Sequence, residues 1–175
     1  MADNKPLIFV VEDEMMQREM LVDHLSKMSH YDIKAFGTGE ECAEAIRNGK
    51  KPTVVFLDFY LNSVKKEARD GLEILTEIKE LAPETEVVML SGQDKIEVAV
   101  DVMKYGAFDY IVKGESAYYR AEKAIFNIYR FHKMKGDASL YKKLTIGFAI
   151  AFVLMIILFI YLQQQGLITN MPGWM

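Results

Sequence analysis

Charged and hydroxyl side chains follow directly after four apolar stretches of strand length. In chain order they are Glu12 with Asp13, Asp58, Ser91 and Lys113. Carboxylates that crowd together repel one another and raise one another's pKa unless a cation lies between them. A hard divalent cation such as Mg²⁺ relieves this repulsion with only a few protein oxygens, because it keeps several of its waters. If the four stretches end at one place, they predict a Mg²⁺ site beside an amine and a hydroxyl.

Each of these residues also has an ordinary structural explanation. An acidic residue after a strand can cap the next helix, where its charge interacts favourably with the helix dipole. Ser91 can simply begin a turn, and Lys113 can be a solvated side chain. The coincidence of all four strand ends favours a functional site over these separate explanations.

The elements that must position these groups alternate along the chain. Apolar runs such as Leu7–Val11 and Thr53–Leu57 are typical of strands that are covered on both faces. Other segments, such as Asp70–Leu81, carry apolar residues at helical spacing. Alternation of about five strands with about five helices predicts an α/β fold, a doubly wound five-stranded parallel sheet. Ligands bind such sheets beyond the carboxyl ends of the strands, where the four groups would meet.

Four short motifs occupy these strand ends. They are Val-Val-Glu-Asp-Glu at 10–14, Val-Val-Phe-Leu-Asp at 54–58, Val-Met-Leu-Ser-Gly at 88–92 and Phe-Asp-Tyr-Ile-Val-Lys at 108–113. In this order they resemble the receiver domain of response regulators in two-component signalling. The resemblance covers about Lys5 to Arg130 and implies the flavodoxin-like fold of the CheY proteins.

The resemblance also implies a metal site and a phosphoacceptor. Asp58 matches the aspartate that accepts a phosphoryl group from a histidine kinase or a phosphotransfer protein. Glu12 and Asp13 match the acidic pair that binds Mg²⁺. The backbone carbonyl of Tyr60 matches the remaining protein ligand of the ion, beside Asp58 itself.

Three further positions match the switch of the family. Lys113 matches the lysine that neutralises the phosphoryl group, and Ser91 matches the hydroxyl residue that bonds to it. Tyr110 matches the switch aromatic, which rotates into space that Ser91 vacates. A local change of charge would thereby repack a protein-interaction face, which is a two-state element.

Three features depart from the usual pattern of the family. Glu12 stands where Asp is common, and its longer side chain still reaches a metal-bound water. The stretch from Asp58 to Asp70 is longer than the usual loop, with Asn62 near the place of a customary Pro. Gly114 follows Lys113 where Pro is usual. Because no core residue is missing, we expect an active receiver rather than a degenerate one.

The composition of the chain changes after Lys143, the last charged residue of the 175. Residues 144–162 are apolar all round and, at about 1.5 Å per residue, span roughly 28 Å, close to the hydrocarbon thickness of a bilayer. This pattern predicts one transmembrane helix. Basic residues precede the span and none follows it; they are Arg130, Lys133, Lys135, Lys142 and Lys143.

The positive-inside rule then orients the chain. We expect a receiver domain at 1–135 in the cytoplasm, a basic juxtamembrane linker at 136–143, and a short tail at 163–175 outside the inner membrane. Gly136–Ser139 predicts a break between helix and span. Gly147 and Ala151 form a small-residue pair that would allow two spans to pack as a homodimer.

Composition argues against several other classes. The net charge is −4 and the folded part has no clustered basic stripe, so nucleic acid is not the expected partner. Cys42 is the single cysteine, which excludes an internal disulfide and a cysteine metal cage. We interpret Cys42 as a packing residue. The first residues have no apolar core of a secretory signal.

We compare three possible functions with the sequence. The first is a membrane-anchored receiver that is phosphorylated at Asp58 and has no DNA-binding output domain; it would be a self-catalysing phosphoacceptor rather than an enzyme. Its downstream protein is not indicated. The second is a phosphorylation-independent membrane scaffold. The third is a haloacid-dehalogenase-type phosphatase, which the sequence disfavours because such enzymes carry a second Asp where Tyr60 stands.

Overall fold

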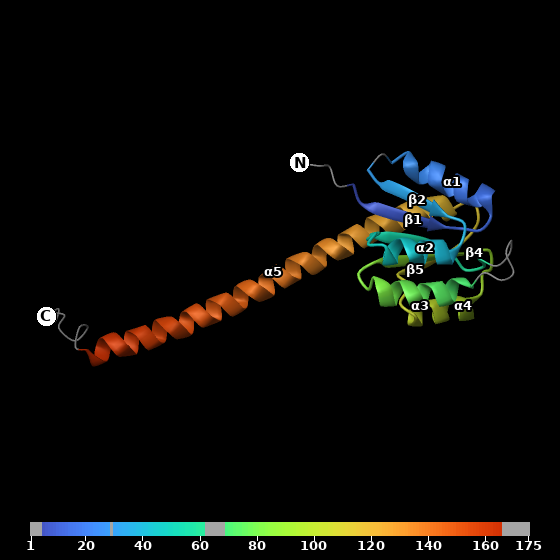
Figure 1. The fold of residues 1–175 in the computed structure, drawn as a ribbon. Helices are drawn as coiled ribbons and strands as arrows, with labels where there is room; N and C mark the ends of the chain where they lie inside the picture. The colour runs from blue at the N-terminus through green and yellow to red at the C-terminus, as the bar shows by residue number, and fades with distance from the viewer. Residues whose placement is uncertain (1–4, 29, 62–68, 166–175) are drawn as a thin grey trace. The chain divides into compact units, whose positions relative to one another are not determined.

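Strands and helices alternate through the computed structural model, which describes residues 5–28, 30–61 and 69–165 (Figure 1). The elements are β1 (Leu7–Val11), α1 (Met15–Ser26), β2 (Asp32–Phe36), α2 (Gly39–Arg47), β3 (Val54–Asp58), α3 (Gly71–Leu81), β4 (Glu86–Ser91), α4 (Ile96–Lys104), β5 (Asp109–Val112) and α5 (Ala117–Gln164). The observed bounds of β1, β3 and α3 lie within one residue of the predicted ranges Leu7–Val11, Thr53–Leu57 and Asp70–Leu81.

The five strands form one parallel sheet in the order β2-β1-β3-β4-β5. The predicted doubly wound five-stranded α/β fold is therefore confirmed. β3 lies at the centre, with β1 on one side and β4 on the other. Pairing of Val11 with Leu57 and of Asp58 with Leu90 brings the ends of these three strands level at one edge.

Alternate strand residues build a core on each face of the sheet, because successive side chains of a strand point to opposite faces. One core packs strand residues such as Phe9, Leu57 and Met89 with buried residues of α2, α3 and α4. The opposite face buries residues such as Phe56 and Ile111. Leu21 and Leu25 of α1, and Ala121, Ala124, Ile125 and Ile128 of α5, are buried as well. Strands β1, β3 and β4 are buried along almost their whole length, which explains their uninterrupted apolar sequences, whereas the edge strand β2 is partly exposed.

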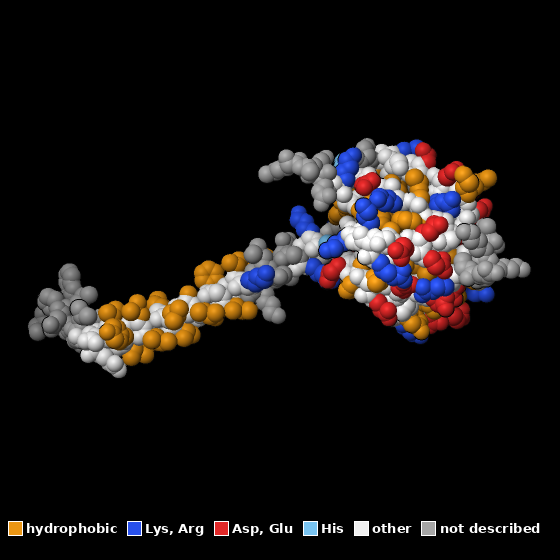
Figure 2. All heavy atoms as spheres, viewed as in Figure 1, with side chains coloured by type: hydrophobic (Ala, Val, Ile, Leu, Met, Phe, Trp, Pro, Cys, Tyr) orange, Lys and Arg blue, Asp and Glu red, His pale blue; other side chains and the backbone are white. Residues whose placement is uncertain are grey.

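The helix α5 runs from Ala117 to Gln164 and includes Gly136–Ser139, where the sequence predicts a break. One glycine in a helix costs only about 1 kcal/mol relative to alanine, which the flanking helical residues offset. The described chain divides into two compact units, residues 1–128 and 129–175. Within the second unit, the helical segment Lys143–Gln164 is long and apolar enough to cross a membrane, with a mean hydropathy of 2.8. Figure 2 shows hydrophobic side chains along this segment.

Candidate functional site

The parallel sheet brings the sequence-predicted residues to one edge. Glu12 and Asp13 follow β1, Asp58 ends β3, Ser91 ends β4, and Lys113 follows β5. Since the four strands are neighbours and run the same way, their carboxyl ends meet there. The arrangement that the sequence predicts is thus present in the structure.

Lys113 contacts both Glu12 and Asp58 and so joins these two acidic residues. Its Nζ donates a hydrogen bond to Glu12 Oε2 at 2.7 Å and lies 2.9 Å from Asp58 Oδ1, with which it forms an ion pair. Both carboxylates are buried, at 2% and 3% exposure. One ammonium group therefore holds together the ends of strands β1 and β3 from its place after β5.

Burial and charge perturb the pKa values of this cluster. Burial and, after it, the Asp58 carboxylate raise the pKa of Glu12 to about 7, although Lys113 opposes the rise. Burial lowers the pKa of Lys113, but the Asp58 and Glu12 carboxylates outweigh burial and raise it overall. Lys113 thus stays charged, whereas Glu12 shares a crowded negative site that one ammonium does not fully balance.

The acidic residues fit a hard cation. Ligand oxygens of Glu12, Asp13 and Asp58 all lie within 4.8 Å of one another. Asp58 Oδ1 is buried and accepts no directed hydrogen bond from the described residues, despite its ion pair with Lys113. Carboxylate oxygens at such spacing are the donor set that Mg²⁺ takes, with water completing its octahedron.

A pocket of about 320 Å³ opens over these groups. Its lining includes Glu12, Asp13, Asp58 and Lys113, together with Tyr60 and Gln93. This volume is ample for a phosphoryl group and a partly hydrated ion. Tyr60, whose carbonyl is a predicted metal ligand, thus stands at the pocket that holds the carboxylates.

Ser91 and Tyr110 are joined through Gln93, which lines this pocket. The Gln93 N–H donates to Ser91 Oγ at 3.1 Å, and Tyr110 donates its hydroxyl hydrogen to the Gln93 carbonyl at 2.6 Å. Ser91 is fully buried and Tyr110 is 9% exposed. Arg120 of α5 donates to the Tyr110 carbonyl at 2.9 Å. A displacement of Ser91 would therefore be transmitted through Gln93 to Tyr110, and from Tyr110 to Arg120 of α5.

The backbone that carries Asp58 is held from two sides. The Phe59 N–H donates to the Leu90 carbonyl at 2.8 Å, and the Gly71 N–H donates to the Phe59 carbonyl at 2.9 Å. A Cβ at Gly71 would lie 2.4 Å from the Asp58 carbonyl oxygen, so glycine is required for this close approach. Asp70 caps α3 by accepting the Glu73 N–H at 2.9 Å. The start of α3 thus packs directly on the end of β3.

Two supporting contacts carry no sequence signal that points to them. Arg18 of α1 donates to the Glu12 carbonyl at 2.6 Å, which fixes the backbone beside the acidic pair. Gln93 acts through its backbone groups, and these are the same in every residue type.

Cys42 is buried, and burial raises its thiol pKa to about 12, which agrees with a packing role.

Comparison with known proteins places this fold and site in a family. Residues 8–118 match the response regulator receiver domain family. The chain is 32% identical over 108 residues to the chemotaxis protein CheY of Listeria monocytogenes, an alignment that covers 61% of this chain and 84% of CheY. The chain therefore belongs to the response regulator receiver domain family and is a receiver domain of two-component signalling.

Longer relatives and solved structures agree. The transcriptional regulatory protein MalR of Bacillus subtilis is 26% identical over 145 residues, or 78% of this chain. The chain spans only 60% of MalR, and smaller shares of other regulatory proteins that it matches. The crystal structure of the NtrX receiver domain from Brucella abortus is 35% identical with a TM-score of 0.58, covering 70% of this chain and 95% of that domain.

The raised pKa of Glu12 predicts a pH dependence of stability in the metal-free protein. Folded Glu12 keeps its proton up to a pH of about 7, whereas the unfolded chain releases it near 4.5. The free energy of unfolding should therefore fall as the pH rises through this window, by about 3 kcal/mol for Glu12 alone. Glu12→Gln, which mimics the protonated form, should remove this component.

Urea unfolding of residues 1–135 between pH 4.5 and 8, without divalent cations, measures it. The difference between wild type and Glu12→Gln reports the part of the pH dependence that needs the Glu12 carboxyl, including its interaction with Asp58 and Lys113. A difference that stays constant across the range would contradict the assignment.

Proposed function

We propose that this chain is a membrane-anchored receiver whose Asp58 accepts a phosphoryl group from a histidine kinase or a phosphotransfer protein. Receiver domains bind Mg²⁺ and interact with such donors as a class. The observation that carries the proposal is the pairing of Lys113 with the buried carboxylates of Glu12 and Asp58, at 2.7 and 2.9 Å, in the lining of one pocket.

The proposed chemistry is an in-line displacement. An Asp58 oxygen bonds to phosphorus while the bond from phosphorus to the donor nitrogen breaks, and the donor imidazole leaves. A carboxylate is a weak nucleophile toward phosphate, so the rate depends on positioning and on neutralising charge. Glu12, Asp13, Asp58 and the Tyr60 carbonyl would hold Mg²⁺, which supplies charge neutralisation at the phosphoryl oxygens.

Lys113 changes partner in this scheme. Its ammonium pairs with Glu12 and Asp58 before transfer, and the new phosphoryl oxygens become a stronger attraction afterwards. Ser91 then turns its hydroxyl toward the phosphoryl group. Its bond from the Gln93 N–H is lost or reorganised, and the Tyr110 hydroxyl that rests on Gln93 follows. This series of changes supports a conformational switch at the face formed by β5 and α4.

Tyr60 disfavours the phosphatase alternative. Haloacid-dehalogenase-type enzymes need a second carboxylate two residues after the nucleophile to act as acid and base. The chain has Tyr60 at that position. A phosphorylation-independent scaffold is the remaining alternative, and the same experiment separates it.

Asp58→Asn should abolish phosphorylation. We expect residues 1–135 with Mg²⁺ and a small acyl phosphate to form an adduct that is stable in acid and labile in base, detected as a gain of one phosphoryl mass. Asp101→Asn, which changes an exposed carboxylate of α4, is the matched control and should leave the adduct intact. Turnover of unrelated phosphate esters would instead favour a phosphatase, and retained partner binding without any adduct would favour a scaffold.

The anchor is the second part of the proposal. The exposed apolar segment Lys143–Gln164, preceded by basic residues, supports a single membrane pass with the receiver on the cytoplasmic side. A soluble protein would leave this apolar surface in water. Phosphorylation would then act close to the inner membrane surface.

Charges within the span should release the chain from membranes. The double variant Leu154→Lys with Ile157→Lys tests this. Each lysine raises the free energy of membrane insertion by roughly 2.5–3.5 kcal/mol at the centre of a span. Alkaline extraction of membranes should leave the full chain in the pellet and move this variant to the supernatant. The paired alanine variant at the same positions should stay in the pellet. Release of the unaltered chain by alkali would contradict the anchor.

A further inference from the structure

Phe59 and Gly71 are hydrogen-bonded to each other directly beside Asp58, and this contact is called the neck. The Gly71 N–H donates to the Phe59 carbonyl at 2.9 Å, although the two residues are well separated along the chain. Gly71 also lies so close to the peptide of Asp58 and Phe59 that a Cβ would approach Phe59 Cα to 2.7 Å. The position of the phosphoacceptor backbone therefore depends on where residues 69–71 are held.

Arg69 is the residue that holds this neck. Its backbone N–H donates to Glu40 Oε1 of α2 at 3.0 Å, and its guanidinium pairs with Glu77 of α3 and donates to the Glu73 carbonyl at 3.2 Å. These contacts attach one residue to two helices that follow different strands. A loop end fixed at several points has fewer conformations to lose when it is ordered.

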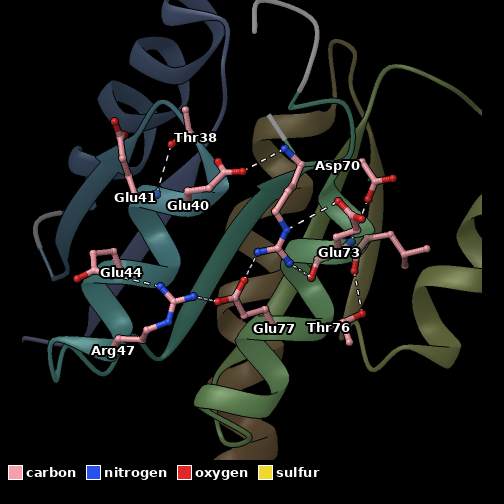
Figure 3. A network of polar contacts seen from close by, with 11 residues as sticks. Thr38, Glu40, Glu41, Glu44, Arg47, Asp70, Glu73, Thr76 and Glu77 are labelled. Carbon is pink, nitrogen blue, oxygen red and sulfur yellow. Dashed lines mark hydrogen bonds and ion pairs between the residues drawn. The ribbon is translucent and has the colours of Figure 1, made fainter. Parts of the chain in front are cut away.

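Glu77 is shared by two arginines. Its carboxylate is 15% exposed and pairs with Arg69 at the neck and with Arg47 of α2, which also donates to Glu44. Figure 3 shows Arg47 and Glu44 on α2, with Glu77 of α3 facing Arg47. The two arginine side chains are similarly exposed, at 47% and 40%. Only Arg69 belongs to the segment that contacts the end of β3.

We propose that Arg69 is a positioning residue for the metal and phosphoryl site, acting through the neck that Gly71 and Phe59 close. This inference rests on the proposed function, because it assigns Arg69 to the same site. The Tyr60 carbonyl directly follows the Phe59 peptide that the neck fixes, and it is the proposed backbone ligand of Mg²⁺. Small displacements of a ligand weaken metal binding, as they do for outer residues that orient ligands.

The test compares Arg69→Gln with Arg47→Gln in the full chain in detergent micelles. Each variant removes one ion pair from Glu77, but only Arg69→Gln removes side-chain contacts at the neck; the backbone bond from residue 69 to Glu40 stays. Calorimetric titration with Mg²⁺ should show affinity about three- to tenfold weaker for Arg69→Gln and for Glu77→Gln. Arg47→Gln should stay within about twofold of wild type. Arg69→Lys should recover part of the loss, since it keeps the charge without the forked geometry.

Hydrogen exchange provides a readout that needs no metal. Without Mg²⁺, the amide of Gly71 should exchange faster in Arg69→Gln than in wild type, and at the wild-type rate in Arg47→Gln. Equal exchange and equal affinity in the two arginine variants would overturn the proposal. If wild type itself fails to bind Mg²⁺, the proposed function is wrong, and the exchange rates of Gly71 still decide whether Arg69 holds the neck.

Discussion

The site depends on one partly buried ammonium group between two buried carboxylates. Lys113 reaches Glu12 and Asp58 at 2.7 and 2.9 Å, and each of the three comes from a different strand. Removing one partner of a buried ion pair leaves a charge without compensation, at a loss of about 3–5 kcal/mol. The same cluster carries more negative than positive charge when Asp13 is counted. A lysine therefore holds the ends of the sheet together, and the carboxylates beside it could hold a metal ion.

The surrounding fold transmits the state of this cluster to other parts of the receiver. Ser91, Gln93 and Tyr110 are linked by hydrogen bonds of 3.1 and 2.6 Å, and Arg120 of α5 donates to the Tyr110 carbonyl. On the other side, Gly71 packs against the Asp58 peptide. A bound phosphoryl group would therefore act on β5 and α5, while the start of α3 keeps the acceptor in place. Helix α5, which carries Arg120, extends from Ala117 to Gln164.

Much of this arrangement follows from the sequence alone, because it depends on periodic patterns. Strand length and apolar content predict where β1 and β3 end, and therefore that Glu12 and Asp58 meet. Contacts such as Arg69 with Glu77, or Tyr110 with the Gln93 carbonyl, depend on tertiary geometry that no local pattern encodes. The break expected at Gly136 is helical in the structure, since one glycine is a weak helix breaker. Asn62, which the sequence places near the position of a customary Pro in the loop after Asp58, lies outside the described residues.

A crystal structure of the receiver grown with magnesium and beryllofluoride would examine the charge cluster most directly. The account predicts beryllofluoride on the Asp58 carboxylate, an ion about 2.1 Å from carboxylate oxygens, and Lys113 Nζ turned from Glu12 to a fluoride. An unmodified Asp58, with Lys113 still paired to Glu12 and no ion between the carboxylates, would contradict it.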